Sequence, residues 1–118
     1  MQDPCSINDL KEELRSFAKQ RDWDQFHSVK NLLLALTGEV GELAEVFQWL
    51  TDQEIKNLSS SDKERAIEEI ADVFLYLIRL SDKLEIDLIT SAQKKLKLNA
   101  EKYPVSHSKG NATKYNRR

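Results

Sequence analysis

The spacing of apolar residues along two stretches constrains the fold of this 118-residue chain more than any other feature. Between residues 29 and 50, apolar side chains recur at alternating steps of three and four, the period of a helix that buries one face. This first stripe consists of Leu33, Leu36, Val40, Leu43, Phe47 and Leu50. A second stripe with the same period consists of Ile67, Ile70, Phe74, Leu77, Ser81 and Leu84. We therefore expect an all-α fold whose two longest helices pack through these stripes.

Capping signals divide the chain into four expected helices. The expected helices span residues 7–19, 29–50, 61–84 and 87–102. Ser6, Ser28 and Asp87 are suited to accept a hydrogen bond from the first turn of a helix. Ser61 and Glu64 form the S-x-x-E pattern of a capping box, which makes residues 51–61 a linker. The sequence therefore predicts a four-helix bundle.

The apolar surface of the 29–50 helix is wider than one neighbouring helix would cover. Leu32, Leu34, Ala35, Val46 and Trp49 all lie outside the stripe. A chain of this length buries only about two thirds of its unfolded surface, so its own core is modest. We expect the core to be completed by homo-oligomerisation, as a dimer or a tetramer. We expect one domain over residues 1–104 and a flexible basic tail over residues 105–118.

Cysteine content and charge exclude several classes of protein. With Cys5 as its only cysteine, the chain has neither an intrachain disulfide nor a cysteine-based zinc site. No apolar run has the length of a membrane span or a signal peptide, so we expect a cytoplasmic protein. Residues 1–93 carry a net charge of −9 and residues 94–118 a net charge of +7. The basic end could bind nucleic acid, hold phosphates, or be a solvated tail.

Two pairs of acids flank the two apolar stripes. Glu39 and Glu42 are spaced i,i+3 on the first helix, and Glu69 and Asp72 are spaced in the same way on the second. If the helices are antiparallel, the four carboxylates converge. No Lys or Arg occurs in residues 31–55 or 66–78, although a solvated helix face normally mixes both signs. Such acids can still be ordinary exposed charges.

Carboxylates crowded together beside a core either acquire raised pKa values or hold a cation between them. Oxygen ligands favour Mg²⁺, or alternatively Mn²⁺, and Mg²⁺ typically binds a few carboxylates together with substrate phosphates. Neither His27 nor His107 follows a glutamate by three residues, which sets aside a di-iron bundle. Gly38 and Gly41 flank Glu39 at a cost to helix stability. They could admit another helix backbone or leave room for a ligand.

The acid pattern, together with three longer segments, resembles a known family. The arrangement Glu39-x-x-Glu42, 26 intervening residues, then Glu69-x-x-Asp72 resembles the signature of the MazG-like all-α nucleoside triphosphate pyrophosphohydrolases. The segments "RDWDQFHSVKNLLLALTGEVGELAEVFQW", "EEIADVFLYLIRL" and "KLNAEKYP" resemble the dCTP pyrophosphatase branch. The resemblance implies Mg²⁺-dependent cleavage of a nucleoside triphosphate to a monophosphate and pyrophosphate, with dCTP or a related or modified dNTP favoured, as nucleotide-pool house-cleaning.

The resemblance also implies roles for individual residues. The four acids would hold the metal against the triphosphate, with Glu39 the acid nearest the attacking water, and Glu45 would fall outside that group. Trp23, Phe26, His27 and Trp49 would surround the base, although tryptophans are often core or interface residues. The remaining candidates for contact with the nucleotide are Lys30, Tyr76, Asn99, Lys102 and Tyr103, with Lys109 and Lys114 for its phosphates.

Two other functional hypotheses are compatible with the sequence. One is a non-catalytic, antitoxin-like or regulatory helical dimer that uses its basic tail on nucleic acid, although no recognition-helix pattern accompanies the basic residues. The other is a relative that binds dUTP or a phosphoribosyl histidine intermediate on the same scaffold. The sequence does not separate ribose from deoxyribose, one metal from several, or a dimer from a tetramer.

Overall fold

The computed structural model describes residues 3–112, and helices are the only regular elements in that range. The prediction of an all-α fold is therefore confirmed. The chain divides into two compact units, Met1–Glu85 and Ile86–Arg118. The first unit contains α1 (Ile7–Gln20), the short 3-10 helix η1 (Asp24–Phe26), α2 (Val29–Phe47), α3 (Asp52–Lys56) and α4 (Ser60–Lys83). The second contains α5 (Leu88–Lys102) and α6 (Val105–Ser108).

Three of the predicted helix caps are present. The Ser6 hydroxyl accepts a hydrogen bond from the Asp9 N–H at 3.0 Å, and the Ser28 hydroxyl accepts one from the Asn31 N–H at 3.1 Å. The Asp87 carboxylate accepts one from the Thr90 N–H at 2.9 Å. Each bond satisfies a first-turn N–H that has no partner within its own helix.

The segment between the two long helices differs from the expectation. Ser59, and not Ser61, caps α4 by accepting from the Asp62 N–H. Three consecutive serines can fill this role, and the earliest one gives the longer helix. A complete capping box lies inside the expected linker, where Thr51 and Glu54 exchange two hydrogen bonds and start α3. Because Thr51 must be extended to cap α3, α2 ends at Phe47 and not at Leu50.

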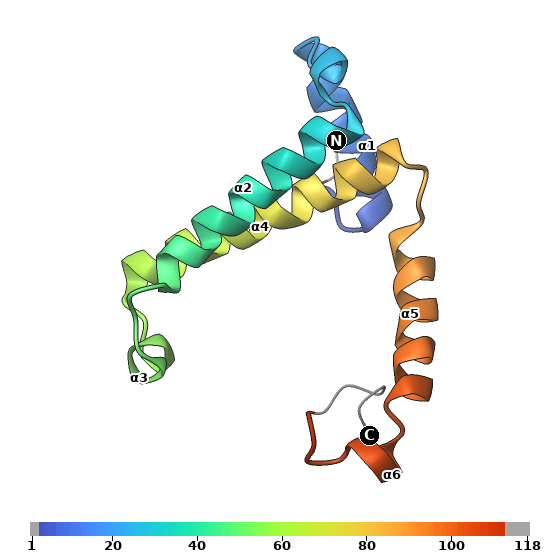
Figure 1. The fold of residues 1–118 in the computed structure, drawn as a ribbon. Coiled ribbons are helices and arrows are strands. Elements are labelled where there is room, and N and C mark those ends of the chain that lie inside the picture. Colours follow the sequence, from blue (N-terminus) through green and yellow to red (C-terminus); the bar gives the residue numbers. More distant parts are fainter. Residues whose placement is uncertain (1–2, 113–118) are drawn as a thin grey trace. The chain divides into compact units, whose positions relative to one another are not determined.

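The helices α2 and α4 lie side by side and run antiparallel (Figure 1). The line of α2 that faces α4 contains Leu32, Glu39 and Val46, spaced seven residues apart, and Leu32 and Val46 are buried. On α4, the buried Ala66 and the half-buried Glu69 lie on the facing line. Glu39 therefore occupies a core position between two buried apolar side chains.

The predicted apolar stripes turn only partly toward the partner helix in a single chain. Leu36, Leu43 and Phe47 are half-buried, whereas the other residues named below stay exposed, which corrects the expectation that the helices pack through the whole of both stripes. Leu33 and Val40 on α2 remain 50% and 48% exposed, because each follows the facing line by one position. The same offset on α4 exposes a second set of apolar residues. Because the helices are antiparallel, both sets lie on one side of the pair, here called the open apolar face: Leu33, Val40, Ile67, Ile70, Phe74 and Leu77.

Helix α1 packs against the C-terminal half of α4. Ala18 of α1 and Ile78 of α4 are buried there. Arg15 of α1 binds the Asp82 carboxylate of α4 through two nitrogens, at 2.7 Å and 2.5 Å. After α1, Asp22 adopts a left-handed conformation with φ of 54°, which turns the chain into η1 and then α2.

The second unit has no buried residue in α5. Its expected start at Asp87 and its end before Pro104 are confirmed within one residue. A four-helix bundle that includes α5 stays a prediction, as does the division at residue 104. Among the described residues, no helix is both long and apolar enough to cross a membrane.

Candidate functional site

Three of the four predicted acids converge where α2 faces α4. Glu39, Glu69 and Asp72 each place one carboxylate oxygen within 4.8 Å of the others. Glu39 comes from the middle of α2, and Glu69 and Asp72 come from adjacent turns of α4. We call these three residues the carboxylate cluster. Convergence of α2 and α4 acids was expected from antiparallel packing, and it arises because the facing lines of both helices carry an acid.

The carboxylate cluster brings several acidic groups close together and is partly shielded from water. Glu39 Oε2 and Glu69 Oε2 are buried and accept no hydrogen bond from the described part of the chain. Burial, followed by the neighbouring carboxyls of Glu42, Glu69 and Asp72, raises the pKa of Glu39 to about 7. Burial and the carboxyls of Glu42 and Asp72 also raise the pKa of Glu69, while its side-chain contact with Glu39 acts in the opposite direction. The cluster therefore holds protons more readily than isolated carboxyls do.

The chemistry of the cluster fits a hard divalent cation. It offers only carboxylate oxygens, it includes two buried oxygens that lack a donor, and no Lys or Arg of residues 3–112 forms an ion pair with it. A cation bound there would replace the missing donors and relieve the repulsion between the acids. The choice among divalent ions does not follow from these oxygens alone.

Other predicted residues near the cluster take distinct positions. Glu42 is exposed one turn beyond Glu39 and contributes to the raised pKa of both Glu39 and Glu69. Tyr76 is half-buried one turn beyond Asp72 on α4. Glu45 is exposed, as expected for an acid outside the group.

The two glycines beside Glu39 stand in open space. A methyl group added at Gly38 or Gly41 would meet nothing within 4 Å among the described residues. No helix backbone of Met1–Glu85 therefore approaches either glycine closely. By helical geometry Gly38 lies on the opposite side of α2 from the open apolar face. Within this unit, the space beside Glu39 is open to a ligand.

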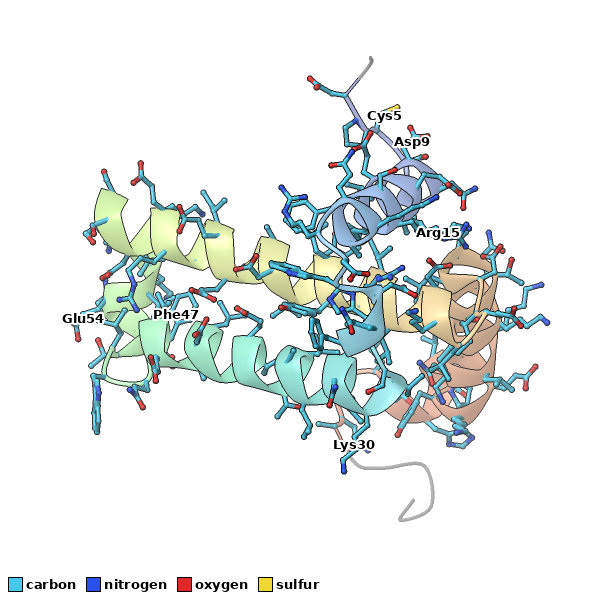
Figure 2. The ribbon with its side chains drawn as sticks, turned by 90° about the horizontal axis from the view of Figure 1, so that it is seen from above. Cys5, Asp9, Arg15, Lys30, Phe47 and Glu54 are labelled. Carbon is cyan, nitrogen blue, oxygen red and sulfur yellow. The ribbon has the colours of Figure 1, made fainter. Side chains whose placement is uncertain are left out.

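The residues expected to surround the base occur at both ends of α2 and not together. Trp23, Phe26 and His27 precede the helix, whereas Trp49 follows it and is 85% exposed. Helix α2 has 19 residues, which corresponds to about 28 Å. Figure 2 shows this separation through Lys30 near the beginning of the helix and Phe47 at its other end. Within one chain, these four aromatic residues cannot line a single pocket.

Trp23 is held in place by local aromatic contacts. Its ring packs edge-on against Phe17 of α1, with 5.8 Å between the ring centroids. The Arg21 guanidinium lies 3.6 Å from the centroid of the same Phe17 ring, on which a cation is attracted by the π-electrons. Trp23 nevertheless stays 44% exposed, so part of its ring is accessible.

The structure contains a second group of charged residues that was not predicted from the sequence. Arg79, buried on α4, donates to Asp24 of η1 at 2.6 Å, to His27 at 3.2 Å and to Asp82 at 3.5 Å. Lys83 also donates to Asp24, at 2.7 Å. We call Arg15, Asp24, Arg79, Asp82 and Lys83 the charge network. The available signal was a lone arginine inside the apolar run "FLYLIRL", which indicates a paired buried charge.

The remaining predicted contacts lie in the second unit or outside the described range. Asn99 is exposed on α5, Lys102 is half-buried at its end, and Tyr103 is partly exposed after it. Lys109 follows α6 and is exposed. Lys114 lies outside the described residues. The nucleotide contacts predicted for these residues stay predictions.

Comparison with known proteins relates the chain to one family. The family model described as MazG-like matches residues 34–117, which include all four predicted acids. A crystal structure of a pyrophosphatase from Archaeoglobus fulgidus is 36% identical and superimposes with a TM-score of 0.79, over 88% of this chain and 97% of that one.

Two similar curated proteins carry the name dCTP pyrophosphatase 1. The one from Rattus norvegicus is 46% identical over 112 residues, and the one from Homo sapiens is 43% identical over the same length. Each alignment covers 93% of this chain but 66% of the relative, so the chain spans just under two thirds of the length of these relatives.

Proposed function

The chain belongs to the MazG-like family, and from this premise we propose that it is a metal-dependent nucleoside triphosphate pyrophosphohydrolase. The single observation that carries the proposal is the carboxylate cluster. Three carboxylate oxygens within 4.8 Å of one another, with raised pKa values and no ion-paired base among the described residues, suit a divalent cation and the phosphates it brings. The names of the relatives from rat and human, and of the archaeal neighbour, support pyrophosphate-releasing chemistry.

Glu39, Glu42, Glu69 and Asp72 are the residues that would hold Mg²⁺, with Mn²⁺ as the alternative. When bound, the metal would neutralise charge on the triphosphate and make water more acidic. The two buried oxygens of Glu39 and Glu69 support this assignment, because each needs a positively charged partner. Glu42 is exposed and would complete the set from the solvent side.

Glu39 is the residue proposed to accept the proton of the attacking water. A pKa of about 7 places this carboxyl where it can both take up and release a proton at neutral pH. In the proposed reaction, the water oxygen forms a bond to the α-phosphorus while its proton passes to Glu39. The bond between that phosphorus and the bridging oxygen breaks, and pyrophosphate leaves with the electron pair.

The proposed substrate is dCTP or a related or modified deoxynucleoside triphosphate, and the proposed role is nucleotide-pool house-cleaning. The names of the two mammalian relatives support dCTP. The aromatic residues Trp23, Phe26, His27 and Trp49 offer surfaces on which a base can stack. Lys30, Tyr76, Asn99, Lys102 and Tyr103 are retained as further nucleotide contacts, within a domain of residues 1–104.

We further propose that the working form is a homo-oligomer. The open apolar face exposes six large apolar residues across α2 and α4, more than isolated surface residues would explain. The aromatic residues at the two ends of α2 also need a second chain if they are to line one pocket. An antiparallel copy would bring Trp49 of one chain toward Trp23 of the other. Both observations support a dimer or a higher assembly.

A substrate screen tests the proposal directly. The purified chain is incubated with each of the eight common ribo- and deoxynucleoside triphosphates and Mg²⁺, and pyrophosphate and orthophosphate are measured separately. We expect pyrophosphate and a monophosphate, fastest with dCTP, and loss of turnover in Asp72→Asn but not in Glu64→Gln, an exposed acid two turns earlier on α4. Release of orthophosphate, or no turnover with any triphosphate, would contradict the proposal. Salt-sensitive binding of DNA without hydrolysis would favour the nucleic-acid reading instead.

A further inference from the structure

The connector between α1 and α2 is attached to α4 by one buried arginine. Arg79 is 6% exposed, and its guanidinium directs Nη2 to Asp24 Oδ1 at 2.6 Å and Nε to His27 Nδ1 at 3.2 Å. Its remaining nitrogen, Nη1, lies 3.5 Å from Asp82 Oδ2 on the same helix. One planar group therefore joins three side chains from two separate parts of the chain.

The direction of the bond to His27 fixes the chemistry of the imidazole. A guanidinium has five N–H donors and no acceptor, so His27 Nδ1 must provide a lone pair. A neutral imidazole that accepts through Nδ1 carries its proton on Nε2. The opposite edge of the ring is then a hydrogen-bond donor whose position is set by Arg79.

The surroundings of His27 favour this neutral form. Burial lowers the pKa of His27, and the positive charges of Arg79 and Lys83 lower it further, while Asp24 opposes them. Asp24 is itself engaged by Arg79 and Lys83, at 2.6 Å and 2.7 Å. Burial, Arg79 and Lys83 together thus outweigh Asp24 and disfavour a second proton on the ring.

The backbone around His27 is also fixed. The Phe26 carbonyl accepts a hydrogen bond from the Asn31 side chain at 3.0 Å, and the His27 N–H donates to the Asp24 carbonyl at 3.1 Å. Trp23, four residues earlier, donates its N–H to the Ala18 carbonyl of α1 at 2.9 Å. The connector is therefore bound to α1, α2 and α4 before any ligand arrives.

We propose that Arg79 is a positioning residue for nucleotide selection, because it holds His27 as a neutral ring that presents Nε2–H to an acceptor atom of the nucleotide. This inference rests on the proposed function, in which His27 belongs to the base-binding residues. Arg79 itself does not touch the substrate. Its contribution is to determine which nitrogen of His27 donates a hydrogen bond and to fix the orientation of the ring.

The first test reads the tautomer of His27 in the wild-type chain, without any enzymatic assay. Long-range ¹H–¹⁵N correlation spectra at pH 7 distinguish a protonated nitrogen from an unprotonated one. We expect His27 to show an unprotonated Nδ1 and a protonated Nε2, with His107, which is exposed, as the internal reference. A protonated Nδ1 on His27, or a doubly protonated ring at pH 7, would overturn the inference.

The second test compares three variants in the pyrophosphate assay. Arg79→Met removes the donors. Arg79→Lys keeps the charge, but its three donors sit on one nitrogen and lack the planar spacing with which separate Arg79 nitrogens reach Asp24 and His27. Both are expected to raise KM for the preferred triphosphate by about tenfold, with kcat changed by less than about threefold. Both should also narrow the difference in kcat/KM between that triphosphate and the other seven. The matched control is Arg15→Met, which removes two hydrogen bonds to Asp82 from the same network without touching His27.

A structural role alone would give a different result. If Arg79→Lys and Arg15→Met lower the melting temperature but leave KM and the order of substrate preference unchanged, the inference is overturned. If Arg79→Met does not fold, Arg79→Lys and the wild-type spectra still decide. The absence of pyrophosphate release by the wild type would overturn the proposed function first, whereas normal hydrolysis with unchanged KM in Arg79→Lys would overturn this inference alone.

Discussion

Two groups of acids in the first unit differ in their partners and in the direction of their pKa shifts. In the carboxylate cluster, Glu39 and Glu69 face each other without an ion-paired base among the described residues, and their pKa values are raised. In the charge network, Asp24 and Asp82 are bound by arginine and lysine, and their pKa values are lowered: chiefly by Lys83 for Asp24 and by Arg15 for Asp82. The same helix, α4, carries members of both groups.

The difference indicates which group stabilises the fold and which is reserved for a ligand. Paired carboxylates strengthen the folded state because they gain partners that the unfolded chain lacks. Crowded, unpaired carboxylates weaken it until something cationic binds. Within residues 3–112, the chain has basic residues paired with one group of acids and none paired with the other, although the members of the two groups on α4 are only about two to four turns apart.

The largest effect is expected from breaking the carboxylate cluster. Asp72→Asn keeps the size of the side chain but removes one charged oxygen ligand, so we expect turnover to fall by at least about 100-fold. Stability without metal should be unchanged or slightly higher, because repulsion decreases. Initial rates of pyrophosphate release and thermal unfolding in a chelator measure both. Glu64→Gln is the control, and an equal loss of activity in that variant would show that general helix charge is responsible.

The next effect is expected from breaking the charge network. Asp82→Asn weakens the paired bonds from Arg15 and leaves the buried Arg79 with one of its two carboxylate partners missing. The two losses together should cost about 3 kcal/mol in the free energy of unfolding. Glu12→Gln, which removes an exposed acid 3.5 Å from Arg15, should change it by less than about 0.5 kcal/mol. Urea unfolding curves measure the difference. Similar values for the two variants would mean that burial of Arg79 does not depend on Asp82.

A smaller effect is expected in how the stability of the carboxylate cluster depends on pH. The pKa of Glu39 is raised from 4.5 to about 7, so its contribution to stability is complete below about pH 4.5 and is lost as the pH rises through 7. Glu39→Gln has no such proton to lose. In a chelator, the variant should gain on the order of 1 kcal/mol over the wild type between pH 5 and pH 8, after allowance for solvent screening.

Thermal unfolding at several pH values tests this directly. Glu45→Gln, an exposed acid on the same helix, should follow the wild type throughout. Addition of Mg²⁺ at pH 8 should reverse the order, because only the wild type has the full set of ligands. Parallel curves for wild type and Glu39→Gln at all pH values would be inconsistent with a proton held at this position.

The smallest effect concerns the open space beside the carboxylate cluster. Gly38→Ala should raise the free energy of unfolding by up to about 1 kcal/mol, since the new methyl group meets nothing within 4 Å among the described residues and alanine favours the helix. If the space serves a ligand, KM for the triphosphate should rise at the same time. Kinetics and urea unfolding on one preparation compare the two. A more stable variant with unchanged kinetics would assign the glycine no role in binding.

The sequence predicted the four longer helices, three of the caps and the acids on the facing helices, because these depend on local periodicity and spacing. It did not predict the short helices η1, α3 and α6. It placed the apolar stripe one position away from the true facing line of α2, which runs through Leu32, Glu39 and Val46. A helix with a wide apolar surface has several possible seams, and only the partner helix selects one. The contacts of Arg79 with Asp24 and His27 join residues more than 50 positions apart, so no local pattern contained them.

The position of Trp49 has a practical consequence. The chain contains two tryptophans, one before α2 and one after it, with Trp49 almost fully exposed and Trp23 packed against Phe17. The molecule therefore carries two optical reporters at opposite ends of one helix. In an isolated chain, quenchers dissolved in water should reach Trp49 far more readily than Trp23. Protection of Trp49 as protein concentration rises would report assembly at that end without any added label.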